Sequence, residues 1–167
     1  MAKTNEELET ELEDNEDTQK DKFLTFTLGN EAYGLEIKYV TEIIGIQEIT
    51  EVPELPNYVR GIINLRGKII PVMDVRVRFK KTAVEYNDRT CIIVVDINEL
   101  SVGLIVDTVS EVISIQEQNI VPPPEINRGG SNNFIKGIGK VGNEVKLLLD
   151  CGKLLNDYEV QNLETIN

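Results

Sequence analysis

Residues 53–79 read PELPNYVRGIINLRGKIIPVMDVRVRF, and this stretch indicates the fold more clearly than any other part of the chain. It contains two apolar runs, residues 61–65 and 69–75, joined by the Arg-Gly-Lys sequence at 66–68. The central glycine adopts positive φ without steric cost, so the pattern predicts a β-hairpin with a tight turn.

This predicted hairpin is cationic. Residues 60–81 carry seven Lys or Arg residues against one acid, Asp74, in a chain of net charge −12. Arg66 and Lys68 would lie at the tip of the hairpin. A cationic tip on an acidic chain indicates a contact surface rather than a catalytic centre.

The order P-x-L-P-x-Y-V-x-G-I-I-N-L-R-G-x-x-x-P-V-x-D, from Pro53 to Asp74, closely resembles the CheW family of bacterial chemotaxis coupling proteins. Several blocks in the same order are more specific than one short motif. The resemblance covers about residues 22–160 and continues in these blocks: residues 23–43, 86–96, 102–112 and 121–126.

The resemblance implies an all-β fold of two five-stranded, SH3-like β-barrels related by pseudo-twofold symmetry, with short helices and a C-terminal helix. We expect the barrels to be intertwined, so linear boundaries are approximate. The expected division is an acidic, disordered tail (1–21), a first barrel half (22–86), a second half (87–154), and a C-terminal helix and tail (155–167).

An internal repeat predicts the same duplication. Residues 34–46, GLEIKYVTEIIGI, match residues 103–115, GLIVDTVSEVISI, at six of thirteen positions. Further along, Gly61-Ile62 recurs as Gly137-Ile138, so the spacing between the two copies grows along the chain. Within the first repeat we expect one or two helical turns at 39–43 and a strand near 43–49.

The composition argues against an enzyme. The 167 residues include no histidine, which removes Ser-His and Cys-His nucleophiles and imidazole metal ligands. Cys91 and Cys151 sit in apolar runs and suit buried thiols, although their spacing does not exclude a disulfide. No phosphate-binding glycine motif is present. We expect neither metal nor cofactor.

The chain also lacks membrane signals. No apolar run approaches the roughly 20 residues of a transmembrane helix, and the N-terminus is acidic rather than apolar. We therefore expect a cytoplasmic protein without membrane insertion.

The strongest candidate contact residue is Arg66. An arginine at a turn usually points into water and contributes little, but its planar fork of donors suits carboxylates or carbonyls of a partner. Asn64 is a polar residue among apolar neighbours. In proteins similar to CheW this segment belongs to the receptor-contacting region.

The repeated units around Ile37, Val40, Val109 and Val112 allow two interpretations. The side chains either pack inside their barrels or line an apolar groove for a helical receptor tip, as the resemblance implies. Glu42 at the rim would then set the register of the partner.

Four further residues complete the candidate set. Gly61 and Gly103 would support the site by allowing close strand approach or a bulge. The resemblance implies a kinase contact at Glu125 and Ile126 in the proline-rich loop; an ordinary surface loop is the alternative.

The leading interpretation is a non-enzymatic adaptor that binds the cytoplasmic tip of methyl-accepting chemotaxis receptors and the regulatory domain of the chemotaxis histidine kinase. We also expect ring or array assembly with the kinase. The alternative is a small β-barrel nucleic-acid-binding protein that uses residues 60–81, against which the net charge of −12 stands. A carboxylate-based enzyme would need a pocket with perturbed acids.

Overall fold

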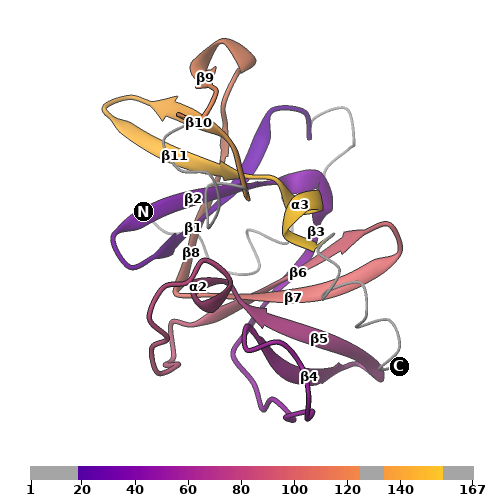
Figure 1. The fold of residues 1–167 in the computed structure, drawn as a ribbon. Coiled ribbons are helices and arrows are strands. Elements are labelled where there is room, and N and C mark those ends of the chain that lie inside the picture. The colour runs from indigo at the N-terminus through magenta and orange to yellow at the C-terminus, as the bar shows by residue number, and fades with distance from the viewer. Residues whose placement is uncertain (1–18, 125–133, 156–167) are drawn as a thin grey trace.

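The computed structural model describes residues 19–124 and 134–155. These residues form two β-sheets and a few short helical segments, and Figure 1 shows the two sheets one above the other with α3 between them. The expected all-β fold is confirmed.

One sheet has six strands, in the order β8 (Thr108–Ser114), β1 (Lys22–Leu28), β2 (Glu31–Glu36), β11 (Glu144–Leu149), β10 (Ile135–Val141) and β9 (Ile120–Val121). The other has five, in the order β3 (Val40–Gly45), β6 (Cys91–Ile97), β7 (Leu100–Val106), β5 (Lys68–Asp74) and β4 (Val59–Leu65). The helical segments are η2 (Ile37–Tyr39), α2 (Val75–Arg78), η3 (Glu117–Asn119) and α3 (Cys151–Leu155).

Each sheet combines strands from both sequence repeats. In one sheet β8 of the second repeat pairs with β1, and in the other β3 of the first repeat pairs with β6. The two parallel pairs are also equivalent, because β11 pairs with β2 at Leu148–Gly34 and β5 pairs with β7 at Val72–Gly103. These matching orders give the fold its pseudo-twofold symmetry.

The main apolar core lies between the two sheets. Successive side chains of β6 point to opposite faces of the sheet, as a strand requires. Ile93 and Val95 join the shared core, whereas Ile92 and Val94 join a second cluster that belongs to the five-stranded sheet alone. A third, smaller cluster belongs to the six-stranded sheet.

The prediction of helical turns at residues 39–43 is wrong. A 3-10 turn lies earlier, at Ile37–Tyr39, and Val40 begins strand β3. Val40 and Ile43 are β-branched and buried, and their backbone pairs with β6. This distant pairing decides the local conformation.

Asp74, the last residue of β5, and Asp150, the residue after β11, cap short helices, as the sequence indicates. Asp74 accepts hydrogen bonds from the N–H groups of Arg76 and Val77, and Asp150 accepts one from Lys153. Helix α3 ends at Leu155, where the expected C-terminal helix and tail (155–167) begins, and residues from 156 on lie outside the described residues. Both cysteines are free thiols. None of the described helices is long and apolar enough to span a membrane.

Candidate functional site

The turn between β4 and β5 has the geometry of a two-residue hairpin turn. Arg66 and Gly67 both have positive φ, at 52° and 87°. The Asn64 side-chain oxygen accepts a hydrogen bond from the Gly67 N–H at 2.8 Å and so stabilises this conformation. Asn64 therefore shapes the turn that presents Arg66.

The Arg66 side chain is exposed and held by one acid. Its two terminal nitrogens donate to the Glu42 carboxylate, the shortest contact being Nη2 to Oε1 at 2.6 Å. The Arg66 side chain is 68% exposed and that of Glu42 only 21%. Because the fork is fixed on one side only, the outer face of the guanidinium is open to a partner.

Lys68 anchors the other flank of the same turn. Its Nζ donates to Ser101 Oγ at 2.8 Å, and this hydroxyl lies 2.5 Å from Asp96 Oδ1 on the neighbouring hairpin. Sequence reasoning missed Ser101 and Asp96, because nothing in their local sequence marks them as neighbours of the cationic turn. The tip of the β4–β5 hairpin is thus tied to strands on both sides.

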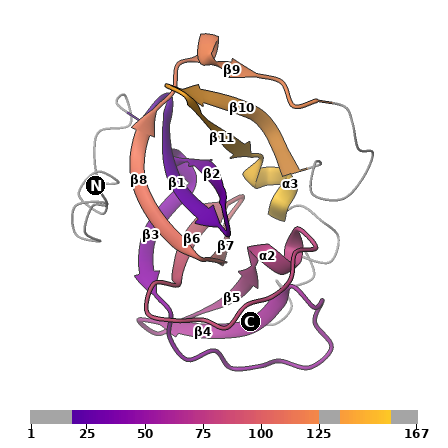
Figure 2. The same ribbon diagram turned by 90° about the vertical axis from the view of Figure 1, so that its left-hand side faces the viewer.

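The four apolar candidates lie at different depths. Ile37 and Val40 are 2% and 7% exposed and belong to the shared core. Val109 and Val112 are half-buried on β8 and pack against that core. Figure 2 shows β3 and β8 along the same edge of the molecule. A receptor contact at these positions stays a prediction, and Val109 and Val112 offer the accessible surface for it.

The two supporting glycines lie where strands approach closely. Gly61 sits at a bulge in the β4–β5 pairing with φ of 146°, and a Cβ there would lie 2.1 Å from the Thr50 carbonyl oxygen. A Cβ on Gly103 would lie 2.7 Å from Ile92 and 2.9 Å from Val72. Both positions leave no room for a side chain.

The basic residues of 60–81 do not form one cationic surface. Arg66, Arg76 and Lys81 are paired with acids on other elements, at Glu42, Asp107 and Glu31. The Arg78 guanidinium stacks between two aromatic rings. This dispersal leaves no continuous track for a phosphate backbone and weakens the nucleic-acid alternative.

Arg76 and Asp107 form a well-shielded ion pair that links α2 to the turn after β7. Nε and Nη2 of Arg76 donate to the two carboxylate oxygens at 2.8 and 2.5 Å, and Gly29 N–H adds a third donor at 2.7 Å. The hydrogen bond from Arg76 holds the pKa of Asp107 below its usual value. Sequence reasoning missed this pair, whose members are 31 residues apart.

The two candidate kinase-contact residues cannot be compared with the structure. Glu125 and Ile126 lie outside the described residues, so the kinase contact stays a prediction. Within residues 19–124 and 134–155, no group of three or more Cys, Asp or Glu side chains is arranged to hold a metal ion.

A family model described as a CheW-like domain matches residues 22–159. The chain belongs to the CheW family. The chemotaxis protein CheW of Klebsiella aerogenes is 37% identical over 150 residues, covering 90% of this chain and 90% of that protein. The Helicobacter pylori protein of the same name is 36% identical over 143 residues, covering 86% of this chain and 85% of that protein.

A solved structure agrees with this membership. The scaffolding protein TtCheW from Thermoanaerobacter tengcongensis superposes with a TM-score of 0.76 at 39% identity, covering 83% of this chain and 94% of that one. The family is one of non-enzymatic chemotaxis scaffolds, so the expectation that this chain is not an enzyme is confirmed.

Proposed function

We propose that this CheW-family chain is an adaptor that couples the cytoplasmic tip of methyl-accepting chemotaxis receptors to the regulatory domain of the chemotaxis histidine kinase. The exposed Arg66 guanidinium, held by Glu42 at the end of a rigid hairpin, is the observation that carries the proposal. We place the protein in the cytoplasm, recruited to receptor arrays at the inner face of the membrane.

A receptor contact at this site would use both charge and apolar area. The guanidinium offers donors to carboxylates or to carbonyls at the end of a partner helix. Val109 and Val112 on β8 would meet the apolar stripe of that helix, and Glu42 and Asn64 would hold the turn in place. Coupling then requires that the adaptor bind one receptor state more tightly than another, because linkage transmits only a difference in affinity.

The kinase would use a separate surface, in or near the proline-rich loop that contains Glu125 and Ile126. Two separate surfaces on one chain would allow receptor and kinase to bind together. Repetition of these contacts would allow assembly into rings or arrays with the kinase.

A pulldown with purified components tests the proposal. The wild-type chain should capture both a receptor cytoplasmic fragment and the kinase regulatory domain. Arg66→Glu should lose receptor capture and keep kinase binding, whereas Arg89→Glu, an exposed residue on another loop, should keep both. Failure of the wild type to bind either partner would refute the adaptor assignment. Equal loss of both partners in folded Arg66→Glu would refute the division into two surfaces.

A further inference from the structure

The repeat places a second glutamate at the position equivalent to Glu42. Residues 40–43, VTEI, align with residues 109–112, VSEV, so Glu111 on β8 stands in place of Glu42 on β3. The two strands are equivalent in the fold, because β3 is the edge strand next to β6 and β8 is the edge strand next to β1. The pairing of each strand shifts register at this point, as at a bulge that re-aims a side chain. The two glutamates therefore hold matching positions.

The arginine that pairs with Glu42 has no counterpart in the second copy. The spacing at which Gly61-Ile62 recurs as Gly137-Ile138 puts Gly142 in place of Arg66. Both residues open the turn of a hairpin, between β4 and β5 in one sheet and between β10 and β11 in the other. Their backbones match as well, with φ of 52° at Arg66 and 60° at Gly142. The second copy thus has the glutamate without the guanidinium.

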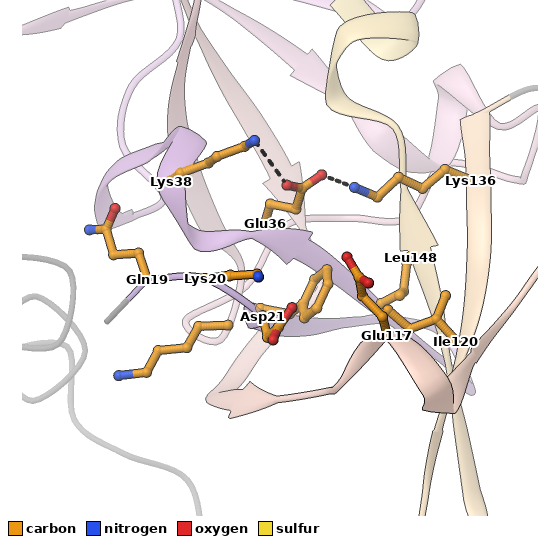
Figure 3. A pocket seen from close by; sticks show the side chains of 11 residues that line it. Gln19, Lys20, Asp21, Glu36, Lys38, Glu117, Ile120, Lys136 and Leu148 are labelled. Carbon is orange, nitrogen blue, oxygen red and sulfur yellow. Dashed lines mark ion pairs between the residues drawn. The ribbon is translucent and has the colours of Figure 1, made fainter. Parts of the chain in front are cut away.

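The Glu111 carboxylate differs from the other carboxylates in the strands of the six-stranded sheet. Within residues 19–124 and 134–155, no group pairs with the side chain of Glu111, which is exposed. Figure 3 shows the opposite case, the Glu36 carboxylate between two lysines. The other acids in these strands pair as follows: Glu31 with Lys81, Glu36 with Lys38 and Lys136, and Glu144 with Lys146.

The backbone that carries Glu111 is held in place by Thr25. The Thr25 hydroxyl donates to the Glu111 carbonyl oxygen at 2.8 Å and accepts from the Glu111 N–H at 3.1 Å. Thr25 itself is only 2% exposed. A carboxylate on a backbone fixed in this way loses little conformational entropy when a partner binds it.

Glu111 also lies within the surface that we assign to the receptor. It falls between Val109 and Val112 on β8, and β8 runs along the same edge of the molecule as β3 (Figure 2). The pseudo-twofold symmetry relates Glu111 to Glu42, which holds Arg66. This surface therefore has an open guanidinium on one side of the symmetry axis and, within the described part of the chain, an unpaired carboxylate on the other.

We propose that Glu111 binds a lysine or arginine of the helical receptor tip, while Arg66 binds an acid or a carbonyl of the same tip. This inference rests on the proposed function and names the charge pattern of the partner. The two opposite charges give the contact a direction, because a reversed helix would bring like charges together. Glu111 therefore selects the orientation of the partner.

Titration calorimetry of the full chain with a purified receptor cytoplasmic fragment tests this pairing. Glu111→Gln should weaken binding by about fivefold, as the loss of one ion pair requires. It should also make binding less sensitive to salt, because one charge pair fewer is screened. The control Glu85→Gln, at an exposed acid of the loop after α2, should bind the fragment like the wild type. Circular dichroism checks that each variant keeps its β-structure.

A second variant blocks the carboxylate from within the chain. A Cβ on Gly142 has no atom within 4 Å, and Arg66 shows that arginine adopts the required backbone conformation. Gly142→Arg should pair with Glu111 and weaken receptor binding about as much as Glu111→Gln does. Gly142→Asn, which tolerates the same φ without adding charge, should bind like the wild type. Adding Gly142→Arg to Glu111→Gln should cause no further loss.

The outcomes separate this inference from the proposed function. Wild-type affinity in Glu111→Gln, measured beside an Arg66→Glu variant that loses the fragment, would overturn the inference alone. A loss in Glu111→Gln that leaves the salt dependence unchanged would also overturn it, because no charge pair would then have been removed. Failure of the wild type to bind the fragment would refute the proposed function and this inference with it.

Discussion

The Arg66 guanidinium contacts the Glu42 carboxylate and so joins the two ends of the five-stranded sheet. Glu42 belongs to β3, the first strand in the order of that sheet, and Arg66 lies in the turn beyond β4, the last. The pair therefore fixes an exposed cation relative to the whole sheet. This rigidity reduces the entropy lost when a partner binds.

Exchanging the two charges separates a partner contact from a structural role. Because the pair is exposed, Arg66→Ala should lower the free energy of unfolding by less than about 1 kcal/mol. The double variant Arg66→Glu with Glu42→Arg should restore the ion pair and the stability, yet bind the receptor fragment at least about tenfold more weakly. Chemical denaturation and titration calorimetry measure the two quantities. Recovery of receptor binding in the exchanged pair would show that Arg66 acts only through Glu42.

Gly61 is predicted to be essential for the hairpin that carries this pair. Gly61→Ala would place a Cβ 2.1 Å from the Thr50 carbonyl oxygen at a φ of 146°. The free energy of unfolding should fall by about 2 kcal/mol or more, because the backbone at Thr50 or at residue 61 must move to relieve this contact. Gly45→Ala is the matched control, since no atom lies within 4 Å of its Cβ. Similar urea midpoints for the two variants would contradict the prediction.

The sequence predicts the β4–β5 hairpin well because its determinants are local. The two apolar runs and the turn between them lie within residues 53–79. The repeat likewise predicts the duplication, since Gly34 and Gly103 occupy equivalent places in their sheets. Strand β3 was harder to predict because its partner β6 comes much later in the chain, beyond the whole β4–β5 hairpin.

The site shows the same division between local and distant determinants. The sequence places Arg66 and Asn64 at the turn, but the Glu42 contact arises only when the sheet brings β3 next to the hairpin. The burial of Ile37 and Val40 also depends on packing between the two sheets. Local pattern alone cannot separate an apolar core residue from an apolar contact residue.

Arg78 is predicted to stabilise the interface between the two repeats. Its guanidinium carbon lies 4.4 Å from the ring centre of Tyr58 and 4.5 Å from that of Phe134. These two aromatics are equivalent in the repeat, because each stands just ahead of the repeated Gly-Ile pair. Arg78→Lys keeps the charge but loses the planar stacking, and should cost about 1–2 kcal/mol of unfolding free energy.

The control for this variant is Arg60→Lys, at an exposed residue of β4. It should change the free energy of unfolding by no more than about 0.5 kcal/mol. Urea unfolding monitored by circular dichroism gives both values. Equal effects at the two positions would contradict a stacking role for Arg78.

The Arg76–Asp107 pair should make stability depend on pH. The hydrogen bond from Arg76 lowers the pKa of Asp107 in the folded state. The ionised Asp107 carboxylate therefore contributes fully to the free energy of unfolding above the unfolded pKa of about 3.9, and this contribution is lost as pH falls through the folded pKa.

Asp107→Asn should reduce the free energy of unfolding by about 1–3 kcal/mol near neutral pH, and this difference from the wild type should shrink below about pH 4. Urea titrations across that range measure the difference, with exposed Asp88→Asn as the control. A difference for Asp107→Asn that stays constant with pH would show that the carboxylate charge does not stabilise the fold.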